Sequence, residues 1–221
     1  MDVSPDATSG TGYETGWLAA YDPNVAPTDA NRACDSYASW TTSPVSNETL
    51  PINCVNRYEA YAFCIWDGGF LPSLAELRYA AAGGSQQRQY PWGSTDPGQG
   101  VEHAIFGDSL GTCNYPTLSN CTGFVNIAPV GTAMLGAGLW GQLDLAGDVD
   151  ELTLDWAYPY VDPCTDCAYL EDPPLPLQGI AGLGGFFSDE YAFLMPSFSF
   201  SAQMYPADRD HSLGFRCART P

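Results

Sequence analysis

The eight cysteines constrain the fold of this chain more than any other feature, because each cross-link fixes two segments that must lie side by side. An even number of cysteines, with only one CxxC motif among them, is typical of a disulfide framework in an oxidising compartment. A turn-rich stretch separates Cys113 from Cys121, and a polar loop separates Cys34 from Cys54. We therefore predict one disulfide bond within each of these two pairs.

The remaining four cysteines include the CxxC motif, Cys164 and Cys167. Half of a zinc site or a redox motif are the alternatives for this motif, but no second CxxC exists and the two histidines stand far apart. We therefore predict a tight structural disulfide between Cys164 and Cys167. Elimination then pairs Cys64 with Cys217, and closing so long a loop stabilises the fold by roughly 4 to 5 kcal/mol in the chain-entropy treatment.

The charge of the chain is strongly unbalanced: the formal net charge is −19, and all seven basic residues are arginines. Such a surface repels phosphate backbones and anionic lipid, so no nucleic-acid partner is expected, whereas cations or basic partners are favoured. The alternative is that the acidity only keeps a secreted or salt-adapted protein soluble. No apolar stretch reaches the roughly 18 residues of a membrane span, so membrane insertion is not expected.

The start of the chain lacks the basic residues and the apolar middle of a signal peptide. Because the cysteines indicate an oxidising compartment, we expect a secreted, periplasmic or cell-surface protein whose signal has been removed. Residues 1–53 are predicted to be a loop-rich N-terminal part held by aromatic side chains. These anchors are Tyr13, Trp17, Tyr21, Tyr37 and Trp40.

Two helices are predicted beyond this part. Apolar residues at helical spacing from Asn56 onward indicate a first helix that ends at Gly68. Ser73 and Glu76 form a capping box for a second helix, which Gly83 ends. Alternation over residues 198–201 and the closing segment 213–217 predict strands. Two main helices, short strands and many loops indicate an α+β fold, with residues 1–221 as a single domain.

Six segments in order are similar to the formylglycine-generating enzyme (sulfatase-modifying factor) family. They are residues 53–64, 68–73, 79–84, 90–93, 139–147 and 214–219. The resemblance implies a C-type-lectin-like variant of the α+β fold, stapled by the same bridge between Cys64 and Cys217, in a bacterial protein. The family's usual opening strand is missing, so we expect the native chain to be longer at its N-terminus.

Enzymes of this family hold copper with two cysteine thiolates, which Cu(I) requires as soft ligands. By register, Asp189 and Leu194 occupy these two positions, and no cysteine lies between Cys167 and Cys217. No copper is therefore expected. A second enzymatic relative, the iron-dependent sulfoxide synthase of ergothioneine biosynthesis, uses three histidines in an additional domain, and this chain has two histidines in all. A residual formylglycine-generating oxidase is thus the least favoured hypothesis, and we do not expect the chain to be an enzyme.

The resemblance also implies a structural Ca²⁺ site. Carried over residue by residue, its ligands are the side chains of Asp144 and Glu151 and the carbonyls of Gly147 and Val149. Clustered carboxylates in a glycine-containing turn suit a cation that takes six to eight oxygen ligands. The alternative is an acidic turn that is only solvated.

The leading hypothesis for function is a non-catalytic binding domain whose ligand is a glycan, a peptide or another protein. Further departures from the family at Phe70, Leu74, Leu77 and Arg78 indicate a remodelled surface, or else drift in a domain that only needs to fold. The candidate contact residues are Phe186, Phe187, Asp189, Tyr191, Phe193, Tyr205, Asp208, Arg209, Asp210 and His211.

The alternative function is a structural subunit of an extracellular assembly or fibre, formed as a homo-oligomer or surface layer. Its contact would be the apolar stretch over residues 193–198, for which a core strand is the competing and favoured interpretation.

Overall fold

The computed structural model describes residues 17–108, 110–157, 168, 170, 179–196, 199–201 and 205–219. Its helices are α1 (Asp29–Arg32), α2 (Arg57–Trp66) and α3 (Leu74–Ala81). Its 3-10 turns are η1 (Ala19–Asn24), η2 (Ser46–Thr49), η3 (Gly84–Gln86), η4 (Phe124–Asn126), η5 (Met134–Gly136) and η6 (Tyr191–Leu194). Its strands are β1 (Thr112–Cys113), β2 (Ser119–Asn120), β3 (Asp150–Trp156), β4 (Ile180–Leu183), β5 (Ser199–Ser201) and β6 (Leu213–Gly214). The predicted α+β class is confirmed. In the described part, no helix is long and apolar enough to cross a membrane.

Both main helices begin where the capping residues predict. The Asn56 side chain accepts a hydrogen bond from the Glu59 amide at 2.9 Å, which satisfies one of the free donors at the start of α2. At α3, Ser73 Oγ accepts from the Glu76 amide at 3.2 Å, and a Glu76 carboxylate oxygen accepts from the Ser73 amide at 2.7 Å. Gly83 follows α3 with a φ of 63°, a left-handed conformation that ends a helix.

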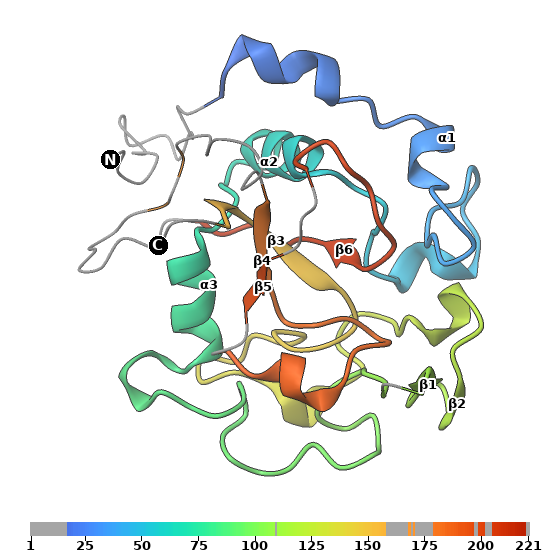
Figure 1. The fold of residues 1–221 in the computed structure, drawn as a ribbon, viewed down its shortest axis with the longest axis vertical. Helices are drawn as coiled ribbons and strands as arrows, with labels where there is room; N and C mark the ends of the chain where they lie inside the picture. The colour runs from blue at the N-terminus through green and yellow to red at the C-terminus, as the bar shows by residue number, and fades with distance from the viewer. Residues whose placement is uncertain are drawn as a thin grey trace.

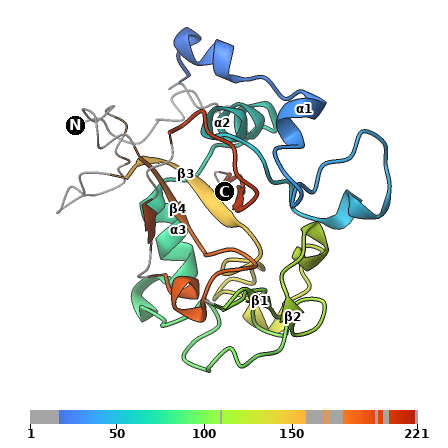
Figure 2. The same cartoon turned by 45° about the vertical axis from the view of Figure 1, so that its right-hand side comes forward.

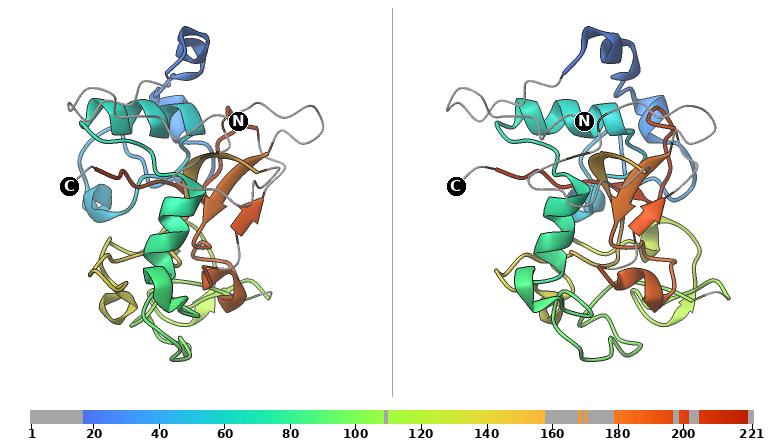
Figure 3. Two further views of the ribbon diagram at one scale, coloured as in Figure 1. Left: turned by 90° about the vertical axis from the view of Figure 1, so that its left-hand side faces the viewer. Right: turned by 60° about the vertical axis from the view of Figure 1, so that its left-hand side comes forward.

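A four-stranded sheet lies at the centre of the molecule, in the order β5-β4-β3-β6. β4 is antiparallel to both β3 and β5, whereas β6 is parallel to β3. Helix α2 packs on β3, and α3 packs on β3 and β4. Figures 1 and 3 show the two helices on different sides of the sheet, with long loops gathered at the end of the molecule away from α2.

The described N-terminal residues 17–53 wrap around α2 and continue toward the β1–β2 hairpin (Figure 2). Aromatic contacts hold them, as predicted. The ring of Trp17 lies 5.5 Å from that of Tyr61, and the ring of Tyr21 lies 4.9 Å from that of Tyr58. The core beneath joins α2 to the sheet and includes Val55, Ala60, Leu71, Leu152 and Leu213. Tyr13 lies outside the described residues.

Three of the predicted disulfide bonds are confirmed: Cys34–Cys54, Cys64–Cys217 and Cys113–Cys121. The second joins α2 to the segment after β6, across 153 residues of sequence. The predicted Cys164–Cys167 bond lies outside the described residues.

The expectation of a core strand from residue 193 onward is wrong for the described residues 193–196. The chain forms η6 over Tyr191–Leu194, and Pro196, which has no amide hydrogen for a strand ladder, follows shortly after. The strand β5 starts only at Ser199. Leu194 and Pro196 are buried. The stretch therefore contributes to the core, and these two side chains offer no free apolar surface.

Candidate ligand-binding face and calcium loop

The segment from the end of β4 to the end of η6 carries the two positions at which the family resemblance places thiolates. Asp189 is half-buried, and its Oδ2 accepts a hydrogen bond of 3.3 Å from the Phe186 amide. Leu194 is 1% exposed and packs in an apolar cluster with Tyr90 and Phe106. All six cysteines of the described part are in disulfide bonds. Among the described residues no cysteine thiolate is therefore available for copper at this place.

An aromatic cluster centred on His211 forms beside this segment. The imidazole stacks on Tyr37 at 4.8 Å, and the ring of Phe186 approaches it edge-on at 6.1 Å. His211 Nδ1 lies 2.5 Å from an Asp35 carboxylate oxygen, which orients the ring. Phe187 lies beneath the cluster at 1% exposure and stacks against Tyr37. Three segments far apart in sequence therefore meet here, and the buried Phe187 offers no contact surface.

The other predicted contact residues divide between surface and support. Tyr205 is 50% exposed, and Asp208 is exposed while accepting a 2.8 Å hydrogen bond from the Tyr205 amide. Arg209 instead forms an ion pair with the buried Glu59, with Nη2 at 2.7 Å from Oε1, so it supports the loop from inside. Asp210 accepts from the Ser212 amide and hydroxyl, which shapes the turn before β6.

Phe193 is half-buried, and the Tyr191 side chain lies outside what the structure describes. We use the term ligand face for Asp35, Tyr37, Phe186, Asp189, Tyr205, Asp208, Asp210 and His211.

Buried carboxylates lie directly behind this face, at the start of β3. Burial raises the pKa of Asp150 to about 8, and the nearby charge of Asp189 adds to the effect. Asp150 Oδ1 accepts from the Gly185 amide at 2.8 Å, whereas Oδ2 has no partner within the described structure. Burial likewise raises the pKa of Asp148 to about 8 and that of Asp189 to about 6. At neutral pH Asp148 and Asp150 therefore favour the protonated form in the folded protein, whereas Asp189 is mostly ionised.

The predicted calcium ligands lie together in the turn that leads into β3. Asp144 has a φ of 56°, and its Oδ2 accepts from the Gly131 amide at 2.6 Å. Arg216 binds both carboxylate oxygens of Glu151 and also donates to the Asp144 carbonyl at 2.6 Å. Burial alone would lower the pKa of Arg216, but attraction and hydrogen bonding to Glu151 raise it.

The Val149 amide donates to the Gly147 carbonyl at 3.0 Å, which curls the turn. The carboxylates of Asp144 and Glu151 and the two carbonyls are hard oxygen donors of the kind that Ca²⁺ takes. A bound ion would share Glu151 with Arg216, a residue that the motif alone did not indicate.

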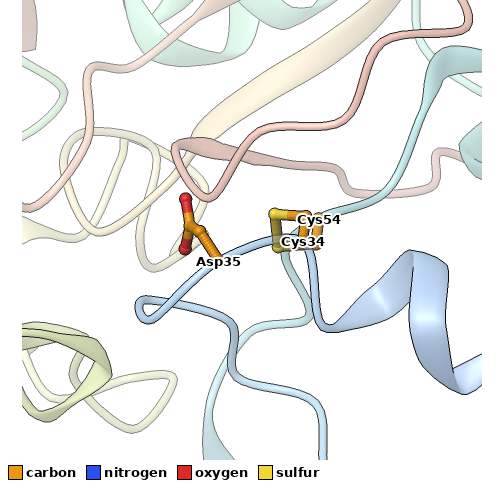
Figure 4. A group of neighbouring side chains, drawn as sticks. All are labelled: Cys34, Asp35 and Cys54. Atoms are coloured by element: carbon orange, nitrogen blue, oxygen red, sulfur yellow. A yellow bond between two sulfur atoms is a disulfide. The ribbon is translucent and has the colours of Figure 1, made fainter.

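The structure also groups Cys34, Asp35 and Cys54, but these residues are no metal site. Figure 4 shows the two sulfurs joined to each other and the Asp35 carboxylate directed away from them. A disulfide offers no thiolate to an ion.

One hollow was not predicted from the sequence. It has a volume of about 990 Å³ and is lined by Trp40, Phe63, Phe215 and Arg219, among other residues. Sequence reasoning missed it because its walls come from the N-terminal loops, α2 and the last residues of the chain. Of these four residues the sequence analysis names only Trp40, as an aromatic anchor.

Relatives of known activity are similar to much of this chain. The formylglycine-generating enzyme of Thermomonospora curvata is 29% identical over 238 residues, which cover 96% of this chain and 76% of that protein. The bovine (Bos taurus) formylglycine-generating enzyme is 28% identical over 169 residues, which cover 76% of this chain but 43% of that protein. Hercynine oxygenase of Mycobacterium tuberculosis is 31% identical over 113 residues, 50% of this chain and 23% of that protein. The match thus spans less than half of the bovine protein's length.

Two solved structures share the fold. PvdO from Pseudomonas aeruginosa has a TM-score of 0.56 at 22% identity, over 80% of this chain and 62% of that chain. Treponema denticola variable protein 1 has a TM-score of 0.54 at 18% identity, over 87% of this chain and 80% of that chain. Residues 9–221 match the family described as the sulfatase-modifying factor enzyme 1-like domain. The chain therefore belongs to the sulfatase-modifying factor enzyme 1-like family.

Proposed function

We propose that this domain binds a ligand without oxidising it, as a secreted, periplasmic or cell-surface module. The observation that carries the proposal is the environment of Leu194, which fills an apolar cluster at one of the two positions where its relatives' thiolates are expected. At the other position, Asp189 offers a hard carboxylate that Cu(I) binds poorly. The disulfide bonds are compatible with an oxidising compartment.

The ligand face supports a binding role through its chemistry. Tyr205 and Phe186 supply aromatic surface, which suits sugar rings and peptide side chains. Asp35, Asp208 and Asp210 supply negative charge beside it. A glycan or peptide that carries a positive group matches this combination of aromatic and acidic side chains.

A combined glycan and peptide array tests the proposal, with the purified chain applied once with calcium and once with a chelator. Tyr205→Ala should weaken any hit, because the ring is half exposed and its removal leaves the backbone intact. Met134→Ala is the matched control, since Met134 is 71% exposed and lies outside the ligand face. Loss of binding in both variants, or silence of the array under both conditions, would contradict the proposal.

The competing assignments have direct tests of their own. Copper-dependent oxygen consumption with a cysteine-containing sulfatase peptide should be at background level, and turnover would show an oxidase instead. Light scattering over a range of concentrations should give a constant mass. A mass that rises with concentration would favour the structural subunit.

We further propose that Ca²⁺ stabilises the turn before β3. Asp144 and Glu151 would hold it with the carbonyls of Gly147 and Val149. Adding a chelator should lower the melting temperature of the native protein, and Asp144→Asn should abolish that difference. Asp96→Asn is the matched control, because Asp96 caps a distant turn at Gly98 and should leave the chelator effect intact. A melting temperature that is the same with and without chelator would refute the calcium proposal.

A further inference from the structure

The hollow of about 990 Å³ described above lies between α1, α2 and the segment that follows β6, and it shares no residue with the ligand face. Its volume lies at the upper end of the range for pockets that enclose small organic ligands, roughly 300 to 1,000 Å³. Three aromatic side chains from different segments line it: Trp40, Phe63 and Phe215. The space therefore suits an organic ligand better than a single ion.

Two disulfide bonds hold the walls of the hollow. Cys34–Cys54 ties the loop after α1 to the stretch beside Ile52, which lines the hollow. Cys64–Cys217 ties α2 to the last segment, and Cys217 is itself part of the wall. Walls that are cross-linked in this way are largely formed before a ligand arrives, so less conformational freedom is lost on binding.

The aromatic side chains of the wall are accessible. Phe63 is 47% exposed and Trp40 is 38% exposed. The ring of Phe63 meets that of Phe215 edge-on at 5.5 Å, and on its other side lies 5.5 Å from the ring of Trp66, which is 78% exposed. The Trp40 indole is held in place, because its Nε1 donates to Asp29 Oδ1 at 3.1 Å. Such rings bind a further aromatic ring by stacking or by edge-on contact.

Four charged side chains line the hollow, and only one of them lacks an ion-pair partner in the described part of the chain. Glu59 pairs with Arg209, and Asp67 pairs with Arg219. Arg32, the last residue of α1, forms no ion pair and no side-chain hydrogen bond with any described residue. One positive charge therefore remains uncompensated in the wall.

The Arg32 guanidinium is held without using its N–H groups. Its central carbon lies 5.4 Å from the centroid of the Trp40 ring, a cation–π contact. Asp29, three residues earlier, accepts from the Trp40 indole and forms no ion pair with Arg32. A guanidinium with free N–H groups binds a carboxylate through two parallel hydrogen bonds. The hollow thus offers aromatic walls and one place for a negative group.

We propose that this hollow binds a small aromatic carboxylate, with its ring against Phe63 and Phe215 and its carboxylate held by Arg32. The net charge of −19 repels anions at long range, but at about 0.15 M ionic strength charges more than about 8 Å apart are largely screened. Direct contact with Arg32 is screened much less. The proposal goes beyond the ligand face and does not depend on it, because the two surfaces have no side chain in common.

The test is calorimetric titration of the full chain at about 0.15 M ionic strength. The probes are naphthalene-2-carboxylate, its neutral amide, octanoate and acetate. Naphthalene-2-carboxylate should bind saturably. The amide should bind about tenfold more weakly, which is the usual worth of a hydrogen bond to a charged group. Octanoate, which has no ring, should also bind more weakly, and acetate should show no saturation.

Two variants separate the charge from the aromatic wall. Arg32→Gln should lower the affinity for naphthalene-2-carboxylate about tenfold and leave that for the amide unchanged. Phe63→Ala should weaken both, because both ligands share the ring. Arg88→Gln and Tyr79→Ala are the matched controls, since they remove one positive charge and one exposed ring around a different pocket, and both should bind like the native chain. A melting curve of each variant checks that it is folded.

Four results would each overturn the proposal. The first is the absence of saturable binding of naphthalene-2-carboxylate. The second is equal affinity of the native chain for the carboxylate and the amide, a comparison that needs no variant. The third is native affinity in folded Arg32→Gln or in folded Phe63→Ala, which would place the binding elsewhere. The fourth is octanoate binding as tightly as naphthalene-2-carboxylate, which would leave a hollow for apolar anions without a preference for rings.

Discussion

Replacing the buried Asp150 by asparagine should stabilise the protein at neutral pH. An acid whose pKa is raised on folding holds more protons in the folded than in the unfolded chain between its two pKa values. The free energy of unfolding therefore falls as the pH rises through the window from 3.8 to about 8. At about pH 7, keeping Asp150 protonated costs roughly 4 kcal/mol relative to the unfolded chain. The amide introduced by Asp150→Asn does not titrate, so this cost disappears.

The geometry favours this particular replacement. An asparagine Oδ1 can still accept from the Gly185 amide, and its Nδ2 takes the place of the carboxylate oxygen that has no partner in the described structure. Volume and shape are kept. The gain in stability should thus reflect the charge alone and should vanish toward about pH 4.

Urea unfolding of both proteins, at several values between about pH 4 and about pH 8 and with chelator present, measures the effect. Asp108→Asn is a control for which the expected change in stability has the opposite sign. Hydrogen bonds from the Thr112 amide, the largest cause, and from the Leu110 amide lower the pKa of Asp108. The ionised Asp108 carboxylate therefore stabilises the folded protein above its ordinary pKa, and this stabilisation is lost on acidification. At neutral pH the Asp108→Asn variant should thus be less stable than the native chain. A constant difference between Asp150→Asn and the native chain across the range would refute the reasoning.

Two further predictions concern long-range links. Removing the Cys64–Cys217 bond should lower the free energy of unfolding by about 5 kcal/mol, because it closes a loop of 153 residues. Removing the Cys113–Cys121 bond should lower it by about 2.5 kcal/mol, because that loop has 8 residues. Equal losses in urea unfolding would contradict the entropic account. Arg216→Gln leaves its buried glutamate partner uncompensated and should cost about 3 to 5 kcal/mol, measured in the same way. A change below about 1 kcal/mol would show that the pair contributes no more than a surface salt bridge.

Local signals allowed the two main helices and the disulfide bonds Cys34–Cys54 and Cys113–Cys121 to be predicted. Asn56, Ser73 and Glu76 act within four residues of the amides they cap, so short-range chemistry specifies where α2 and α3 begin. Cys113 and Cys121 lie eight residues apart, and the turn-rich sequence between them indicates that they pair. The same locality explains why the α+β class followed from the sequence.

The ligand face was only partly predictable. Phe186 and Phe187 are adjacent phenylalanines, yet one is half exposed and the other is buried against Tyr37, a residue 150 positions away. Arg209 pairs with Glu59 at the same separation of 150 residues, and no pattern near either residue indicates it. Burial of this kind depends on which distant segments pack together, and neither the type nor the spacing of the side chains predicts that packing.

The Arg216 link to Glu151 was missed for the same reason. The motif assigned Glu151 to calcium alone, and the arginine that binds both of its oxygens comes from a segment 65 residues later.

The parallel pairing of β6 with β3 has a consequence for how the chain folds. Asp150 lies opposite Leu213, and Phe70 bridges to Ala218 just beyond the Cys64–Cys217 bond. Residues 213–218 thus complete contacts with α2, the segment that follows it and the central strand β3. A chain emerging in order from its N-terminus holds an open sheet edge until these residues arrive, and contacts of such sequence separation form slowly. Final folding must therefore follow synthesis of the C-terminal segment, and a nascent chain halted before residue 213 should remain open to proteases or chaperones.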